Sequence, residues 1–183
     1  MPFSVESRVG YERVVSRQGS VAGSYSYLGT NYPFNFIGSF ALSAAISSAF
    51  TLAGHPSVYW TDVRIRTQGY RYQLQYRHYL SATKPAPEGF YLAPHFSYTK
   101  ADYDIRLKDF DTQVTINTTN RNYNLLLGFQ HILGRHFVID AFTGLGYRDK
   151  TTKSFDQNGK LLEALPKGTR LKLSSGLNLG WGF

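Results

Sequence analysis

The feature that most constrains this chain is a strict alternation of apolar and polar residues. It is clearest in TQGYRYQLQYRHYL, residues 67–80. One side of an extended chain would carry Tyr70, Tyr72, Leu74, Tyr76, His78 and Leu80, and the other side Arg71, Gln73, Gln75, Arg77 and Tyr79. Side chains alternate between two faces with a period of two residues in a β-strand, but not in a helix. The stretch is therefore predicted to be a strand with one apolar face.

Seven segments show this alternation: residues 3–15, 21–27, 67–80, 90–98, 123–133, 137–147 and 170–183. Short turns follow the first, third and fifth segments, whereas long polar loops are expected after the second, fourth and sixth. Short and long connections that alternate in this way indicate an antiparallel up-and-down meander. We therefore predict an all-β chain with a single domain over residues 1–183.

One stretch departs from the strand pattern. Residues 35–54, NFIGSFALSAAISSAFTLAG, carry no charge and are rich in Ala and Ser. We predict a helical or irregular insert that packs on the rim of the sheet. A membrane-spanning helix here would place the flanking strands on the wrong sides, and the interior of a small barrel is filled by side chains.

The composition excludes several classes of function. The 183 residues include no cysteine, so neither a disulfide framework nor a thiolate metal site is available. The net charge is +8, but no run of five or more Lys and Arg occurs, and we expect no nucleic-acid partner. No histidine lies in a close metal-binding spacing and no phosphate-binding glycine loop is present, so no metal or cofactor is predicted.

The same pattern fits two architectures, which differ in whether the apolar face of the sheet points toward the protein interior or toward the surroundings. A soluble barrel or sandwich points its apolar face inward, whereas a membrane barrel points it outward. The polar faces mix charges of both signs with Gly and Ala, as expected for a crowded, paired interior. The apolar faces carry aromatic rings near their ends, as in the girdles at membrane interfaces. These rings belong to Tyr25, Tyr27, Tyr70, Tyr72, Tyr98, Tyr123, Tyr147 and Trp181. We therefore predict an antiparallel up-and-down transmembrane β-barrel.

The closing stretch RLKLSSGLNLGWGF agrees with this prediction. Its apolar positions run at every second residue to the final Phe. It resembles the C-terminal signal of bacterial outer-membrane barrels, which ends on an aromatic residue and is read by the barrel-assembly machinery. Leu177, Leu179, Trp181 and Phe183 are predicted to face lipid and to form this assembly signal.

The strand count raises a question of closure. Bacterial barrels have even strand numbers and eight is the smallest common size, whereas seven strands are visible here. We expect eight, with the first strand and a signal peptide preceding residue 1. Alternatively, the eighth strand lies within residues 36–63.

The stretches VGYERVV, YRYQLQYRHYL and PEGFYLAPHFSY resemble a family of small bacterial outer-membrane barrels classed as a domain of unknown function. The resemblance covers residues 9–98 best, and the terminal strand agrees with it, but the insert at 35–54 departs from the pattern. It implies an eight-stranded barrel in the outer membrane of a didermal, Gram-negative bacterium. The family has no established activity, so the resemblance carries over no catalytic residue.

Two sets of polar residues follow from the predicted faces. A polar network that plugs the lumen is predicted from Glu6, Arg8, Glu12, Arg71, Arg77, His95, Asp140 and Lys172. Contacts to lipopolysaccharide phosphates are predicted from the basic loop after Tyr147, namely from Arg148, Lys150, Lys153 and Lys160. His95, His136 and Asp140 also share the polar faces, where an enzyme would pair a histidine with a serine. We interpret them instead as parts of the buried network.

Three functions remain open at this point. The first is an integral outer-membrane barrel, a monomer in contact with lipid and lipopolysaccharide, with a structural, adhesive or envelope-interaction role and no enzymatic activity. The second is an outer-membrane enzyme that acts on lipid or peptide at the barrel rim. The third is a soluble lipocalin-like carrier.

Overall fold

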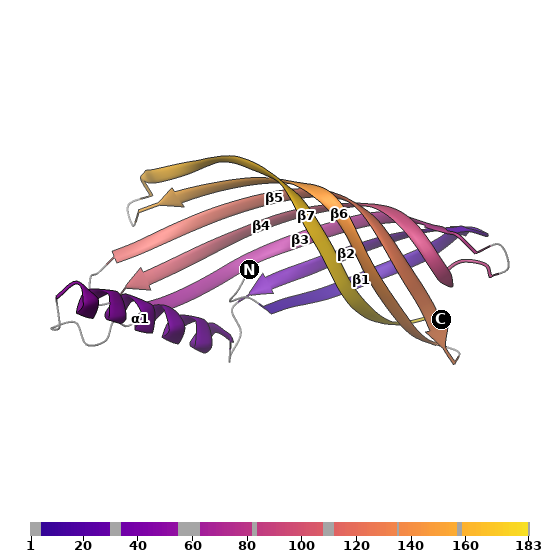
Figure 1. Cartoon of the computed structure of the whole chain (residues 1–183), viewed down its shortest axis with the longest axis horizontal. Coiled ribbons are helices and arrows are strands. Elements are labelled where there is room, and N and C mark those ends of the chain that lie inside the picture. Colours follow the sequence, from indigo (N-terminus) through magenta and orange to yellow (C-terminus); the bar gives the residue numbers. More distant parts are fainter. Residues whose placement is uncertain are drawn as a thin grey trace.

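Seven strands form one continuous antiparallel sheet in the computed structural model, which describes residues 5–29, 34–54, 63–81, 84–107, 112–134, 136–156 and 159–182. The strands are β1 (Val5–Ser16), β2 (Gly19–Gly29), β3 (Val63–Tyr79), β4 (Gly89–Leu107), β5 (Thr112–Leu133), β6 (Phe137–Phe155) and β7 (Leu161–Trp181). Each strand pairs with its neighbours in sequence, in the order β1 to β7. The sheet is long and strongly curled, so that β7 crosses the face of the other strands in Figure 1.

The predicted all-β, up-and-down meander is thus confirmed, and each of the seven alternating segments contributes a strand. The sheet is not closed, however, since no backbone pairing joins β1 to β7 among the described residues. An eighth strand within 36–63 is not found in the described part of this stretch, because α1 (Phe34–Leu52) occupies most of it. Residues 55–62 lie outside the described residues.

The prediction of long loops after Tyr98 and Tyr147 is wrong, because β4 and β6 continue through these segments. β4 extends past Tyr98 to Leu107 and pairs with β5 from Thr112, and β6 extends past Tyr147 to Phe155. Pairing persists there because Thr is abundant in these segments and favours extended backbone even without an apolar face. The result is two long hairpins that project beyond the shorter β1 and β2.

The predicted insert at 35–54 is confirmed as a helix, and it covers part of a sheet edge. β2 ends opposite Gln68 of β3, which leaves the beginning of β3 without a strand partner on that side. α1 packs against β3 (Figure 1), and the Ser39 hydroxyl accepts a hydrogen bond from the Ile65 backbone amide at 3.4 Å. Covering an exposed strand edge with a helix prevents it from pairing with other chains. Among the described residues, no helix is both long enough and apolar enough to cross a membrane.

The burial of the two sheet faces is the reverse of that in a soluble domain. Large apolar side chains lie exposed on the outer, convex face: Leu171 is 84% exposed, Val9 79% and Leu177 64%. The inner face buries Ser, Thr, Asn and Gln side chains together with Arg77 and Asp140. The buried apolar cluster on that face is small: Tyr79, Tyr91, Ala93 and Leu126, with Phe142 packed against it.

Candidate functional site: a polar network inside the curled sheet

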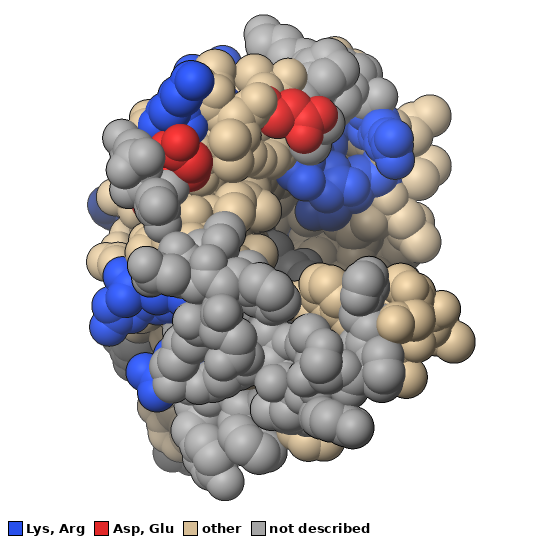
Figure 2. Space-filling view, turned by 90° about the vertical axis from the view of Figure 1, so that its left-hand side faces the viewer, with Lys and Arg blue, Asp and Glu red and all other residues tan. Residues whose placement is uncertain are grey.

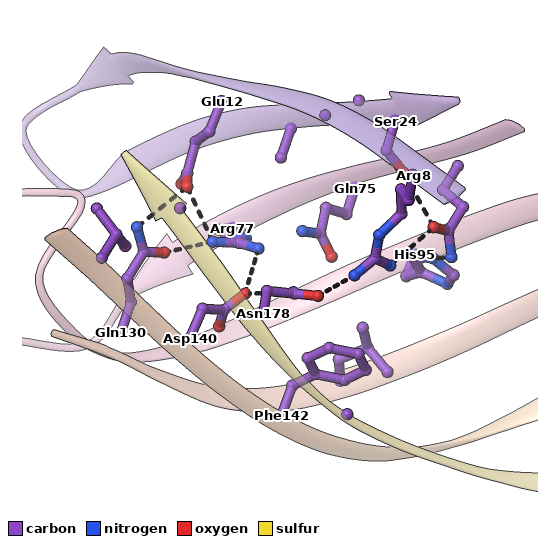
Figure 3. Close-up of a pocket in the computed structure, with 18 of the residues that line it drawn as sticks. Arg8, Glu12, Ser24, Gln75, Arg77, His95, Gln130, Asp140, Phe142 and Asn178 are labelled. Atoms are coloured by element: carbon purple, nitrogen blue, oxygen red, sulfur yellow. Dashed lines mark hydrogen bonds and ion pairs between the residues drawn. The ribbon is translucent and has the colours of Figure 1, made fainter. Parts of the chain in front are cut away.

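Arg77 is the centre of the inner network. It projects from β3 and is only 4% exposed. Its guanidinium lies 2.9 Å from a carboxylate oxygen of Glu12 on β1 and 2.8 Å from one of Asp140 on β6. It also donates to the side-chain carbonyl of Gln130 on β5 (Figure 3). One arginine thereby links four of the seven strands.

Both carboxylates receive further hydrogen bonds. The Tyr91 hydroxyl donates to Asp140 at 2.7 Å, and the Tyr79 hydroxyl lies 3.0 Å from Glu12. The Arg77 guanidinium also stacks over the Tyr91 ring, 4.7 Å from its centroid. A buried ion pair offsets its desolvation cost only when additional donors satisfy the remaining lone pairs, as they do here.

A second series of hydrogen bonds crosses the gap between the two edge strands of the sheet, β1 and β7. Asn178 of β7 donates to Asp140 at 2.8 Å and accepts a hydrogen bond from Arg8 of β1. Arg8 also donates to Gln73 of β3 at 3.1 Å. Figure 3 shows Asn178 between Asp140 and Arg8. The edge strands β1 and β7 therefore meet through side chains, although their backbones are unpaired.

The other predicted network residues are less tightly connected. Glu6 and Arg71 form a separate ion pair at 2.5 Å, and Arg71 also donates to Thr99 at 3.0 Å. His95 lies 3.3 Å from the Gln73 amide nitrogen and 3.0 Å from that of Asn124. Lys172 makes no hydrogen bond or ion pair with any residue that the structure describes, although it lines the same cavity. That cavity has a volume of about 1390 Å³. It runs along the inner face of the sheet and extends into the gap between β1 and β7, where outward residues such as Tyr11 and Leu177 also line it.

Sequence reasoning missed the uncharged members of the network. Gln130 and Asn178 lie on strand faces that were predicted to be polar, yet nothing in their residue type distinguished them from other amides. Tyr91 also lies on the inner face, and nothing in the sequence indicated its partner. Its position opposite Gly128 in the β4–β5 register explains how its ring is accommodated, because a Cβ at Gly128 would overlap that ring.

The four predicted lipopolysaccharide contacts divide between different surfaces. By strand alternation Arg148 and Lys150 share the inner face of β6 with Asp140, whereas Lys153 points to the outer face. Lys160 lies in the short connection to β7 and is exposed. The basic segment that was expected to be one loop is a paired hairpin. Its charged side chains therefore alternate between the inner and the outer face of the sheet.

The predicted lipid-facing residues of β7 lie on the outer face. Leu177, Leu179 and Trp181 are all more than half exposed, and the Trp181 ring stacks on His136 with centroids 5.3 Å apart. Phe183 lies outside the described residues. These side chains form part of an outer band that continues around the sheet.

We call this feature the outer apolar band. It comprises the outward positions of residues 70–80, 90–98, 123–133, 137–147 and 171–181 on β3 to β7. The strand register aligns its tyrosine border: Tyr72 pairs with Tyr98, and Tyr123 with Tyr147. Immediately beyond this border the outward residues become polar, as at Lys100, Arg121 and Asp149. The band is nine to eleven residues long on each strand.

The opposite border of the band lies at the short turns. In the turn after β3, Glu88 accepts from Lys84 at 2.8 Å and lies 2.9 Å from the His131 ring nitrogen. The hydrogen bond from Lys84, helped by that of His131, lowers the pKa of the Glu88 carboxyl below its ordinary value. Polar, charged groups therefore delimit the apolar band at this end as well.

Catalytic arrangements receive little support from the geometry. Within the described residues, the hydrogen-bonded histidines contact amides, the Glu88 carboxylate or a backbone carbonyl, and none of these bonds reaches a serine hydroxyl. No group of three possible metal ligands occurs among them either. Comparisons with protein-family models, with curated proteins and with solved structures each found no match.

Proposed function

We propose that this chain is an integral outer-membrane β-barrel protein of a Gram-negative bacterium, with a structural, adhesive or envelope-interaction role. The observation that carries the proposal is the outer apolar band with its aligned tyrosine border. A tilted strand crosses the hydrocarbon layer with about 9–11 residues. The band has this length on five consecutive strands, and tyrosine rings lie where the membrane interface would be.

The polar inner face of the sheet favours the membrane-barrel proposal over the alternative of a soluble, lipocalin-like carrier. A lipocalin-like protein would hold an apolar ligand against an apolar lining, whereas this inner face carries the Glu12–Arg77–Asp140 network. We expect this network to close the lumen at its level and so to act as a plug. Large, stable single-channel currents would contradict this role.

We propose that the sheet closes into an eight-stranded barrel in the membrane. In the described part of the chain, the facing edges of β1 and β7 carry backbone groups without pairing partners, and lipid offers them none. The barrel-assembly machinery would insert the chain, with the end of β7 as its signal. Lys153 and Lys160 are the residues best placed to contact lipopolysaccharide phosphates, because one is outward and the other lies in the connecting turn.

The proposal is tested by the partition of the purified full chain between lipid vesicles and aqueous buffer. We expect the folded protein to co-sediment with the vesicles and to resist extraction by alkaline carbonate, because about half of each strand's surface is apolar and outward. Folded, monodisperse behaviour in buffer without detergent would contradict the proposal.

A further inference from the structure

The upper part of the inner face, from the level of Asp140 toward the long hairpins, carries an excess of positive charge. Arg8, Arg71 and Lys172 line the cavity there. In the described residues of the strands, between Asp140 and the irregularity at Lys150, Glu6 is the only carboxylate on this face, and it is already paired with Arg71. Figure 2 looks onto this end and shows Lys and Arg side chains beside the hollow.

The β6–β7 hairpin concentrates this charge. Arg148 lies directly opposite Arg170, and Lys172 lies one inward position further along β7, opposite Gly146. Like charges on directly opposed residues destabilise a sheet unless a counter-charge lies nearby. Between Asp140 and Lys150 the described strands of the hairpin supply none on this face, because Asp149 points outward and Glu163 lies beyond the irregularity at Lys150.

Buried acceptors without donors lie beside the cations. Asn122 and Asn124 are 4% and 7% exposed and line the cavity, and each donates its amide N–H to a neighbour. Their Oδ1 atoms, and the Ser174 hydroxyl, have no hydrogen-bond partner among the described residues. Buried polar atoms normally have a partner, so this lining fits a bound molecule that brings hydroxyl donors together with a negative charge.

From this juxtaposition we infer that the cavity around Lys172 binds a small oxyanion carried on a hydroxyl-bearing molecule, a phosphorylated or carboxylated sugar. Lys172 and Arg148 would meet the oxyanion, since charge-assisted hydrogen bonds to phosphate and carboxylate are the strongest available to these side chains. Asn122, Asn124 and Ser174 would accept from the sugar hydroxyls once their covered oxygens turn toward the cavity. The inference requires the curled sheet but does not depend on what surrounds its outer face.

The test is isothermal titration of the purified full chain, folded in an uncharged and sugar-free detergent, with glucose 6-phosphate, glucuronate and glucose as probes. We expect at least one charged sugar to bind and uncharged glucose not to bind. Preference for glucose 6-phosphate or for glucuronate identifies the anion as phosphate or carboxylate. Lys172→Gln should weaken binding at least about tenfold, which corresponds to the loss of one charge-assisted hydrogen bond.

Lys153→Gln is the matched control, because it removes one positive charge from the same hairpin but on its outer face. It should change the affinity by less than about twofold, since exposed charges at this distance are screened. Equal loss in both variants, or no binding of either charged sugar at millimolar concentration, overturns the inference. If Lys172→Gln fails to fold by circular dichroism, Arg148→Gln takes its place with the same expected loss. Vesicle partition of the wild type is measured separately, so failure here leaves the membrane proposal intact.

Discussion

At the scale of single residues, Arg77 has the most consequential environment in the molecule. It is buried against two carboxylates, one from the edge strand β1 and one from β6, the strand next to the other edge. Removing one member of a buried ionic cluster is costly mainly because the remaining charges stay buried without a partner. The cluster therefore couples the folding of β1, β3 and β6.

Arg77→Met should lower the free energy of unfolding by about 3–5 kcal/mol, because Glu12 and Asp140 lose their counter-charge. Urea unfolding in detergent micelles, followed by tryptophan fluorescence, measures the change. Arg17→Met, in the exposed turn after β1, is the control and should change little. Adding Glu12→Gln and Asp140→Asn to Arg77→Met should recover part of the loss. A cost no larger than that of Arg17→Met would show that the cluster is not buried in solution.

Gly128 illustrates a second residue-scale constraint. The Tyr91 ring lies over its Cα on the inner face, so Gly128→Ala should overlap that ring and destabilise the protein by about 1–3 kcal/mol. Gly23→Ala is the matched control, because the nearest atom to its new Cβ would be 3.8 Å away. The same urea titration compares the two variants. Equal stabilities would mean that the Tyr91 ring has another position available to it.

At the scale of elements, each strand carries two independent patterns. The period of two sorts side chains to the inner and outer faces, and the change from apolar to polar outward residues marks where the band ends. β7 shows both: Leu177 lies near the middle of its apolar stretch, and Leu171 lies next to the border set by Tyr147. The outer face of β7 therefore offers positions at different proposed depths in the membrane, which can be compared by substitution.

Leu177→Arg should cost roughly 2–4 kcal/mol when the protein folds into lipid vesicles, because a lipid-facing cation at the midplane is strongly unfavourable. Leu171→Arg should cost only about 0–1 kcal/mol, because a side chain near the interface reaches polar headgroups. Folding titrations in vesicles measure both. Equal, negligible costs would indicate that the outer face of β7 does not contact lipid.

At the scale of the whole molecule, the unusual feature is a sheet curled so far that the described parts of its two edges bond through side chains without backbone pairing. Arg8 of β1 reaches Asn178 of β7, and Asn178 also holds Asp140 of the central cluster. The edge-to-edge contact and the Arg77 cluster are thus one continuous network. The contact between the two edges of the sheet therefore depends on this network.

A double-mutant cycle tests the contact between the edges. Arg8→Ala and Asn178→Ala should be coupled by about 0.5–1.5 kcal/mol in urea unfolding, as expected for one hydrogen bond across the gap. Ser7→Ala with Asn178→Ala serves as the control cycle, since Ser7 points to the outer face of β1. Additive effects in the first cycle would indicate that β1 and β7 are apart in solution.

Much of the fold was predictable because the alternation of side chains is a local property. A strand sends residues i and i+2 to the same face whatever its partner, so the seven strands, their polar faces and the placement of Glu12, Arg77 and Asp140 on those faces followed from residue order. The helical insert followed from an uncharged stretch without that period. The ends of β4 and β6 were missed because polar, Thr-rich segments lose the apolar signal while they keep pairing.

The amino-acid sequence by itself determined which residues lie inside and which outside. Only the tertiary structure decided which inner residues meet, because register and curvature bring together side chains far apart in the chain. Glu12 and Gln130 lie 118 positions apart and yet share a hydrogen bond. Among the described residues, curvature also left β1 and β7 unpaired while their side chains touch. It placed Lys172 on the same face as Asn124, with Gly146 between them. Neither result has a local signal, since both depend on how far the whole sheet curls.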